Sequence, residues 1–140
     1  MTSRLLVALQ FGLMALVIVR FDASGAGHSH VALLVAGGLL GAWALWTNRP
    51  NNFNIRPEPR DGGRLVTAGP YRFVRHPMYL AVLLFTARFV RADPVQWVGV
   101  AGLAAVLFTK ARREERLMAL AHPGYAAYRA FTRAIIPFIL

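Results

Sequence analysis

The chain has 140 residues, of which 56% are hydrophobic and only 16% are charged; this composition disfavours a soluble domain and excludes a disordered chain. Sixteen basic and six acidic residues give a formal net charge of +10, but the charges lie between long apolar runs, so we expect a membrane partner and no nucleic acid. The absence of cysteine excludes disulfide bonds, thiolate metal sites and cysteine catalysis.

Four apolar runs predict membrane helices, at Leu5–Val19, Val31–Trp46, Met78–Val90 and Val95–Thr109. Each is shorter than the roughly 20 residues that cross a bilayer comfortably, although flanking arginines can reach out to the headgroups. Glycines at positions 37, 38 and 41 should let the second run approach a neighbouring helix closely. A signal peptide is the alternative for the first run, because small residues follow it at 23–27.

Two polar segments separate and follow these runs. Residues 47–78 are rich in arginine and proline, and their five prolines rule out a continuous helix. Asp93 or Ala92 should cap the fourth run, with Pro94 at its first position. Beyond it, residues 110–121 predict a charged helix, His122 and Pro123 a helix end, and residues 125–132 a short second helix.

The fold class we predict is all-α, an integral membrane bundle of about four transmembrane helices forming a single domain over residues 1–140. Residues 1–47 hold the two N-terminal helices; residues 48–140 hold the polar loop, a helical hairpin and the C-terminal helices. In this topology thirteen basic residues fall on one side of the membrane and only Arg20, Arg88 and Arg91 on the other. The positive-inside rule then places both termini and both polar segments in the cytoplasm.

Three strings carry the residues best suited to chemistry: Gly69 to Tyr79, with two arginines and a histidine; Glu114 and Glu115, side by side in a chain with six acids; and Tyr125, Tyr128, Arg129 and Arg133 at helical spacing. Each has a plain alternative as an interfacial belt or a solvated, salt-bridged helix. His28 and His30 alone are a weak metal signal, and we predict no metal site. Dinucleotide, P-loop, zinc-protease and nucleophile-elbow motifs are missing from the sequence.

At these strings the sequence resembles the isoprenylcysteine carboxyl methyltransferase and phospholipid methyltransferase superfamily, in its small bacterial form. The matching pieces, in order, are Asn52 to Ile55 with Pro57 and Pro59, Leu65 to Thr67 with Gly69 to Arg72, Arg75 to Tyr79, Glu114 with Glu115, then Pro123, Tyr125 and Tyr128, and finally Arg133, Ile136 and Pro137. They cover residues 52–138, with a membrane hairpin in the middle.

The resemblance implies S-adenosylmethionine as methyl donor, bound at the cytoplasmic face of the bacterial inner membrane. The cofactor-binding residues it implies are Tyr71, Arg75, His76, Pro77, Tyr79, Glu114, Glu115, Tyr128 and Arg129. Arg75 and Glu115 are the catalytic candidates, with Arg75 orienting the acceptor. One glutamate, here assigned as Glu115, would take the polar hydrogens of the cofactor while Glu114 pairs with a base, and Arg129 or Arg133 would hold the cofactor carboxylate.

The acceptor expected from this resemblance is lipid-like and amphiphilic, methylated on a carboxylate or an amine; its identity and the oligomeric state stay open. Two alternatives remain. One is a membrane reductase of the sterol-reductase type, which would use NADPH. The other is a small scaffold without enzymatic activity, which explains the charge asymmetry but not ordered motifs on both sides of a hairpin.

Overall fold

The computed structural model describes residues 2–21, 28–49, 52, 54–56, 58 and 62–137. Its helices are α1 (Ser3–Val19), α2 (His28–Asn48), the 3-10 helix η2 (Gly69–Arg72), α3 (Pro77–Ala87), α4 (Pro94–Ala121) and α5 (Tyr125–Phe131). Within the described ranges there is no β-strand, so the all-α prediction is confirmed. The small residues expected after the first apolar run lie outside those ranges, as do Pro57 and Pro59.

The predicted starts of α3 and α4 are confirmed. Pro77 and Pro94 stand at the beginning of these helices, where a backbone N–H has no helical partner and its loss costs nothing. Asp93, rather than Ala92, is the residue that caps α4: its carboxylate accepts a hydrogen bond of 2.9 Å from the backbone N–H of Val95.

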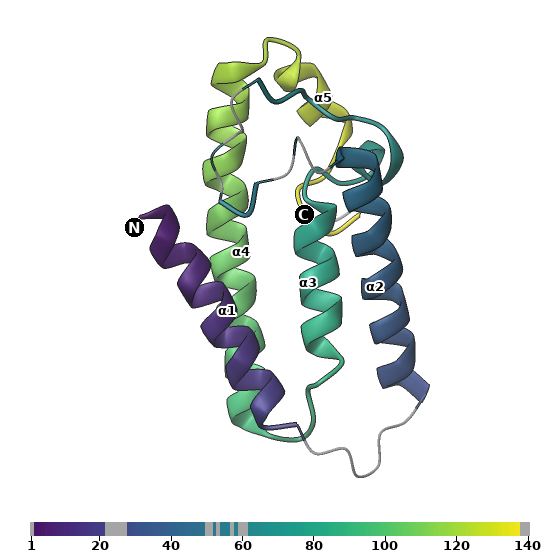
Figure 1. Ribbon diagram of the computed structural model, residues 1–140, viewed down its shortest axis with the longest axis vertical. Coiled ribbons are helices and arrows are strands. Elements are labelled where there is room, and N and C mark those ends of the chain that lie inside the picture. The colour runs from purple at the N-terminus through teal and green to yellow at the C-terminus, as the bar shows by residue number, and fades with distance from the viewer. Residues whose placement is uncertain are drawn as a thin grey trace.

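Two segments that the sequence suggested separately form one helix in the structure. α4 runs without a break from the fourth apolar run through the charged segment, a total of 28 residues. At 1.5 Å per residue its length is about 42 Å, longer than the roughly 30 Å hydrocarbon core of a bilayer. Figure 1 shows its C-terminal turns projecting past the end of α2. Glu114 and Glu115 therefore lie on a rigid extension of an otherwise apolar helix.

The long helices associate mainly as two pairs, α2 with α3 and α1 with α4 (Figure 1). Gly37 allows the first pair to pack closely, as predicted: a Cβ atom there would lie 2.9 Å from the backbone nitrogen of Phe85 and 3.1 Å from the carbonyl oxygen of Ala81. Backbone atoms cannot yield as a flexible side chain does, so this crossing requires glycine.

Two of the four expected membrane helices, α2 and α4, are long and apolar enough to cross a membrane by length and composition. α1 is a shorter apolar helix of 17 residues. α3 has only 11 residues, against 13 in the predicted run, because its helix ends at Ala87. The four-span arrangement thus stays a prediction for α1 and α3.

The structure gathers the chemically rich segments at one end of the helices. The end of α2, the start of α3, the end of α4 and all of α5 lie together at the top of Figure 1. The other end holds the connections that carry Arg20, Arg88 and Arg91. Residues 69–79 and 112–133 meet in this way although the 32 residues 80–111 separate them in the sequence.

Candidate functional site

The backbone of Arg75 and His76 is held by the C-terminal segment of the chain. The N–H of Arg75 donates to the carbonyl of Arg133 at 2.8 Å, and the N–H of His76 donates to the carbonyl of Ala134 at 2.9 Å. Because α3 begins at the next residue, Pro77, the site backbone is fixed on both sides. This short parallel pairing holds the side chains of Arg75 and His76 in position without the help of a ligand.

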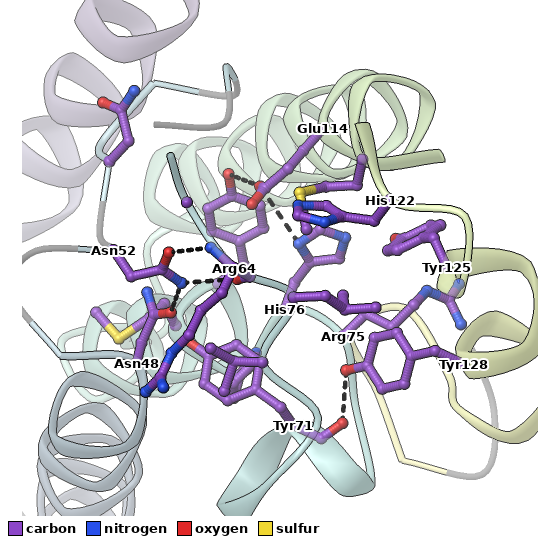
Figure 2. Close-up of a pocket in the computed structure, with 18 of the residues that line it drawn as sticks. Asn48, Asn52, Arg64, Tyr71, Arg75, His76, Glu114, His122, Tyr125 and Tyr128 are labelled. Carbon is purple, nitrogen blue, oxygen red and sulfur yellow. Dashed lines mark hydrogen bonds and ion pairs between the residues drawn. The ribbon is translucent and has the colours of Figure 1, made fainter. Parts of the chain in front are cut away.

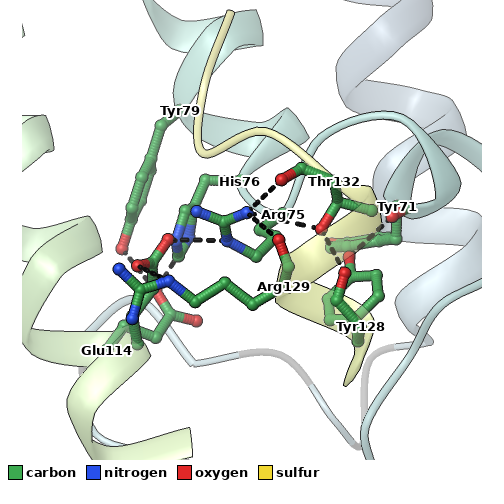
Figure 3. Close-up of polar contacts among 9 residues, drawn as sticks. Tyr71, Arg75, His76, Tyr79, Glu114, Tyr128, Arg129 and Thr132 are labelled. Carbon is green, nitrogen blue, oxygen red and sulfur yellow. Dashed lines mark hydrogen bonds and ion pairs between the residues drawn. The ribbon is translucent and has the colours of Figure 1, made fainter. Parts of the chain in front are cut away.

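Arg75 and Glu115 form a buried ion pair. Figure 3 shows Arg75 together with its neighbours Arg129 and Thr132. Arg75 Nε lies 2.7 Å from Glu115 Oε1, and the two side chains are 8% and 6% exposed. Arg75 Nη1 also donates to the carbonyl of Thr132 and, at 3.4 Å, to that of Arg129. A buried charge pair is stable only when its remaining hydrogen-bonding groups are satisfied, and the C-terminal segment provides these partners.

His76 lies between the two glutamates. Its Nδ1 is 3.5 Å from Glu114 Oε2 and its Nε2 is 3.4 Å from Glu115 Oε1, while the imidazole stacks on the ring of Tyr79 with centroids 5.2 Å apart. Burial by itself would lower the pKa of His76, but the two carboxylates outweigh burial and raise that pKa above its ordinary value of 6.5. The two carboxylates thus stabilise the imidazolium form, in which both ring nitrogens are donors.

The two adjacent glutamates have different surroundings, as expected for residues about 100° apart around a helix. Glu115 is turned inward to Arg75. Glu114 is 34% exposed, lines the cavity described below and accepts a hydrogen bond of 2.9 Å from the Tyr79 hydroxyl. We predicted a basic partner for Glu114 and a cofactor role for Glu115. In the structure Glu114 contacts His76 and lines the cavity, while Glu115 pairs with Arg75; the cofactor role of Glu115 stays a prediction.

A cavity opens beside this cluster (Figure 2). The empty space between its walls, which includes open solvent at the mouth, is about 830 Å³. Of the predicted site residues it is lined by Tyr71, Arg75, His76, Pro77, Tyr79, Glu114 and Tyr128. Glu115 lies behind Arg75 instead, and Arg129 is 58% exposed with its Nε 3.7 Å from Glu115 Oε2. Arg133 lines a separate hollow.

Asn48, Asn52 and Arg64 form one wall of the cavity. The site predicted from the sequence did not include these three residues. The Asn52 amide accepts from the backbone N–H of Arg64 at 2.8 Å and donates to its carbonyl at 3.0 Å. It also donates to Asn48 Oδ1 at 2.7 Å, which ties the loop to the end of α2 (Figure 2). Asn52 does stand in the motif that carries the resemblance; Asn48 and Arg64 have no local signal in the sequence.

Tyrosines form a further part of the cavity lining. The Tyr128 hydroxyl donates to the carbonyl of Tyr71 at 2.6 Å, and the rings of Tyr125 and Tyr128 meet edge to face at 5.9 Å. Burial raises the pKa of Tyr71 and Tyr128 above the ordinary value of 10, so both hydroxyls stay protonated at neutral pH. His122, predicted only as a helix end, caps α4 and also lines the cavity.

Lys110, the single lysine of the chain, is 1% exposed. We grouped it with the charged surface of the tail, but its ammonium donates to Gln10 Oε1 at 2.6 Å and to the carbonyl of Ile55 at 2.9 Å. It also lies 5.3 Å from the centre of the Tyr79 ring. Lys110 therefore connects α1 and the polar loop to the tyrosine that contacts Glu114.

The sequence model of the isoprenylcysteine carboxyl methyltransferase (ICMT) family matches residues 30–120. The chain belongs to this family. The matched residues include Arg75, His76, Glu114 and Glu115, and the family takes its name from a carboxyl methyltransferase. Over 81 residues the chain is also 36% identical to the cobalt-zinc-cadmium resistance protein CzcN of Cupriavidus metallidurans. That alignment covers 56% of this chain and 38% of the relative, so the chain spans well under half of the relative's length.

Proposed function

We propose that this ICMT-family protein is an integral membrane methyltransferase that uses S-adenosylmethionine. It transfers the methyl group to a carboxylate or amine of a lipid-like acceptor at the cytoplasmic face of a bacterial inner membrane. The observation that carries the proposal is the cavity next to the Glu114–His76–Tyr79 cluster, which rests on the Arg75–Glu115 pair. All five of these residues lie within residues 30–120, the range matched by the family model.

The side chains around the cavity suit the parts of S-adenosylmethionine. Glu114 offers a carboxylate to the ammonium group, and Arg56 and Arg64 offer guanidinium groups to the carboxylate. The rings of Tyr71, Tyr125 and Tyr128 supply aromatic faces, which attract cations such as a sulfonium. The amides of Asn48 and Asn52 can recognise the polar edge of adenine.

When bound, S-adenosylmethionine supplies a methyl group already activated for displacement, so the protein's main task is orientation. Arg75 cannot swing freely, because Glu115 and the Thr132 carbonyl hold its guanidinium beside the cavity. We assign it to orient the acceptor. A carboxylate acceptor needs no base; an amine acceptor must lose a proton, and Glu114 is the carboxylate that faces the cavity.

The topology we propose has both termini in the cytoplasm and the cavity at that membrane surface. Its support is the charge asymmetry of the sequence, together with the meeting of the polar loop, the end of α4 and α5 at one end of the helices (Figure 1). The acceptor then reaches the site from the bilayer and the cofactor from water.

Calorimetric titration of S-adenosylhomocysteine into detergent-purified protein tests the proposal, with NADPH titrated in parallel. We expect saturable binding of S-adenosylhomocysteine alone, weakened in Glu114→Gln and unchanged in the matched control Arg116→Gln, which alters an exposed residue of the same helix. Transfer of labelled methyl groups into a membrane lipid extract would follow.

Binding of NADPH alone would overturn the proposal in favour of a reductase. Binding of neither compound, in detergent and again in lipid nanodiscs, would favour the scaffold.

A further inference from the structure

An exposed apolar patch lies outside the cavity, near the C-terminus of the described chain. Phe73 is 49% exposed, Phe131 87% and Ile136 40%. Phe73 and Phe131 line one shallow hollow together with Arg72 and Arg133. We call these five residues the C-terminal patch. None of the roles given under Proposed function uses their side chains, and exposed apolar groups of this size mark an interaction surface.

The position of the C-terminal patch along the helices follows from how η2 packs. A Cβ atom on Gly69, whose φ is +57°, would lie 2.5 Å from Thr47 Oγ1, so η2 rests directly against the last turn of α2. Phe73 comes immediately after η2, and Trp46, next to Thr47, is 86% exposed. Phe73 and Trp46 therefore belong to the region where α2 ends.

The other half of the patch is brought to the same region by backbone pairing. The N–H of Arg133 donates to the carbonyl of Phe73 at 3.3 Å, and Val74 bridges to Arg133 in parallel. Figure 1 shows the C-terminal segment returning from α5 toward the start of α3. Phe131 and Ile136 flank this pairing, so the whole patch lies near the level at which α3 begins at Pro77.

The positive charges of Arg72 and Arg133 indicate what kind of partner the C-terminal patch contacts. The Arg72 guanidinium lies 5.3 Å from the centre of the Phe73 ring, and Arg133 lines the same hollow, which includes no acidic residue among the described side chains. The patch interleaves aromatic and aliphatic groups with arginine, and it lies at the level of a helix end that exposes tryptophan. This combination matches the interface of a bilayer with anionic headgroups.

We propose that the C-terminal patch inserts into the headgroup region of an anionic lipid surface and so seats the segment that holds Arg75 and His76 against the membrane. The inference rests on the membrane placement given under Proposed function. Because residues 133–134 carry the backbone partners of Arg75 and His76, lipid contact at Phe131 and Ile136 would order the cavity wall from outside.

The chain has no cysteine, so single substitutions give clean sites for a nitroxide spin label. We would label Phe73→Cys and Phe131→Cys in nanodiscs made of phosphatidylglycerol and phosphatidylcholine. For each label we would measure collision with oxygen, which partitions into lipid, and with a water-soluble nickel chelate. The expected result is a ratio of oxygen to nickel collisions severalfold higher than that of Leu120→Cys.

Leu120→Cys is the matched aqueous reference: Leu120 is 85% exposed, like Phe131, but lies on the last turns of α4, beyond the end of α2 (Figure 1). Leu39→Cys, in the apolar middle of α2 and 67% exposed, is the bilayer reference. Unfolding midpoints equal to that of the unsubstituted protein would show that the labelled variants are folded.

The outcomes separate this proposal from the one it rests on. If the Leu39 label collides with nickel as readily as the Leu120 label, the membrane placement itself is wrong and the inference falls with it. If the Leu39 label is in lipid but the labels at Phe73 and Phe131 match Leu120, only the inference is overturned and a soluble partner becomes the occupant. If the labels at Phe73 and Phe131 give the same ratio of oxygen to nickel collisions in nanodiscs of pure phosphatidylcholine, the preference for anionic lipid is overturned.

Discussion

The two ends of the helices use the same residue types in different ways. At the site end, Arg75 and His76 face two glutamates beside a cavity. At the other end, the Arg88 guanidinium packs on the rings of Phe21 and Phe89 at 4.8 and 4.6 Å. His30 there contacts the carbonyl of Arg88 at 2.6 Å rather than a carboxylate.

The difference lies in where the acids are placed. The described acid of the far end, Asp93, is 24% exposed, caps α4 and pairs with the 46% exposed Arg20 at 2.5 Å. At the site end Glu115 is buried and Glu114 opens onto the cavity. Arginine and histidine therefore gather at both ends, whereas the pairing of two adjacent glutamates with a cavity belongs, among the described residues, to the site end. Four predictions test that distinction, from the largest expected effect to the smallest.

Glu115→Gln should have the largest effect, because it leaves the buried Arg75 guanidinium without a counter-charge. Breaking a buried pair in this way typically costs about 3–5 kcal/mol of unfolding free energy, and we expect cofactor binding to be lost as well. Denaturation in detergent followed by helical signal would measure the first effect. The double change Arg75→Met with Glu115→Leu should recover much of the stability without recovering binding. Full stability in Glu115→Gln would show that the pair does not support the fold.

Glu114→Gln should weaken binding of S-adenosylhomocysteine by roughly 10- to 100-fold, with a smaller loss of stability than Glu115→Gln because Glu114 is partly exposed. The amide can still accept a hydrogen bond from Tyr79, but it loses the charge; hydrogen bonds to charged groups contribute about 1.5–3 kcal/mol, and about 1.4 kcal/mol is tenfold in affinity. Isothermal calorimetry measures the change. Unchanged affinity would remove Glu114 from the cofactor site.

The contribution of His76 should depend on pH. Its pKa in the folded protein is raised by the neighbouring glutamates, so the protonated form stabilises the fold. This stabilisation is fully present below the unfolded-state pKa of about 6.5 and is lost as the pH rises through the folded-state pKa. The difference in unfolding midpoint between wild type and His76→Gln should therefore shrink with rising pH. A difference that grows with pH would mean that His76 is neutral in the folded state.

Arg88→Lys should have the smallest effect on function. The lysine keeps the charge but loses most of the stacking on Phe21 and Phe89, which we expect to cost about 1 kcal/mol of stability. Binding of S-adenosylhomocysteine should stay the same, since Arg88 is at the end opposite the cavity (Figure 1). Loss of binding with normal stability would contradict the distinction between the two ends.

Local sequence signals predicted much of the fold. Pro77 and Pro94 begin helices as expected, His122 and Pro123 follow the end of α4, and Gly37 marks a close helix crossing. These features depend on the backbone conformation and the side-chain volume at single positions. Both can be inferred from the residue itself and its neighbours in the sequence. The motifs likewise indicated most of the cavity-lining residues between Tyr71 and Tyr79.

Other features depended on contacts between distant positions. Nothing next to Lys110 shows that it is buried against Gln10, 100 residues earlier. The cavity wall at Asn48 and Arg64 depends on how the polar loop folds back on α2. The different surroundings of Glu114 and Glu115 depend on the rotation of α4 against α3, which is set by packing along the whole helix.

By itself, the sequence determined the all-α class, the apolar helices, the starts of α3 and α4, the charge asymmetry and the family, because periodicity, proline placement and motif order are local properties. Only the tertiary structure decided which glutamate meets Arg75, that Arg129 and Arg133 lie outside the cavity, and which apolar groups remain exposed. The physical reason is that a side chain's partner is set by helix rotation and chain return. The fold adopts the helix rotations and the path of the C-terminal segment that give the lowest free energy, and this depends on contacts between residues far apart in the sequence.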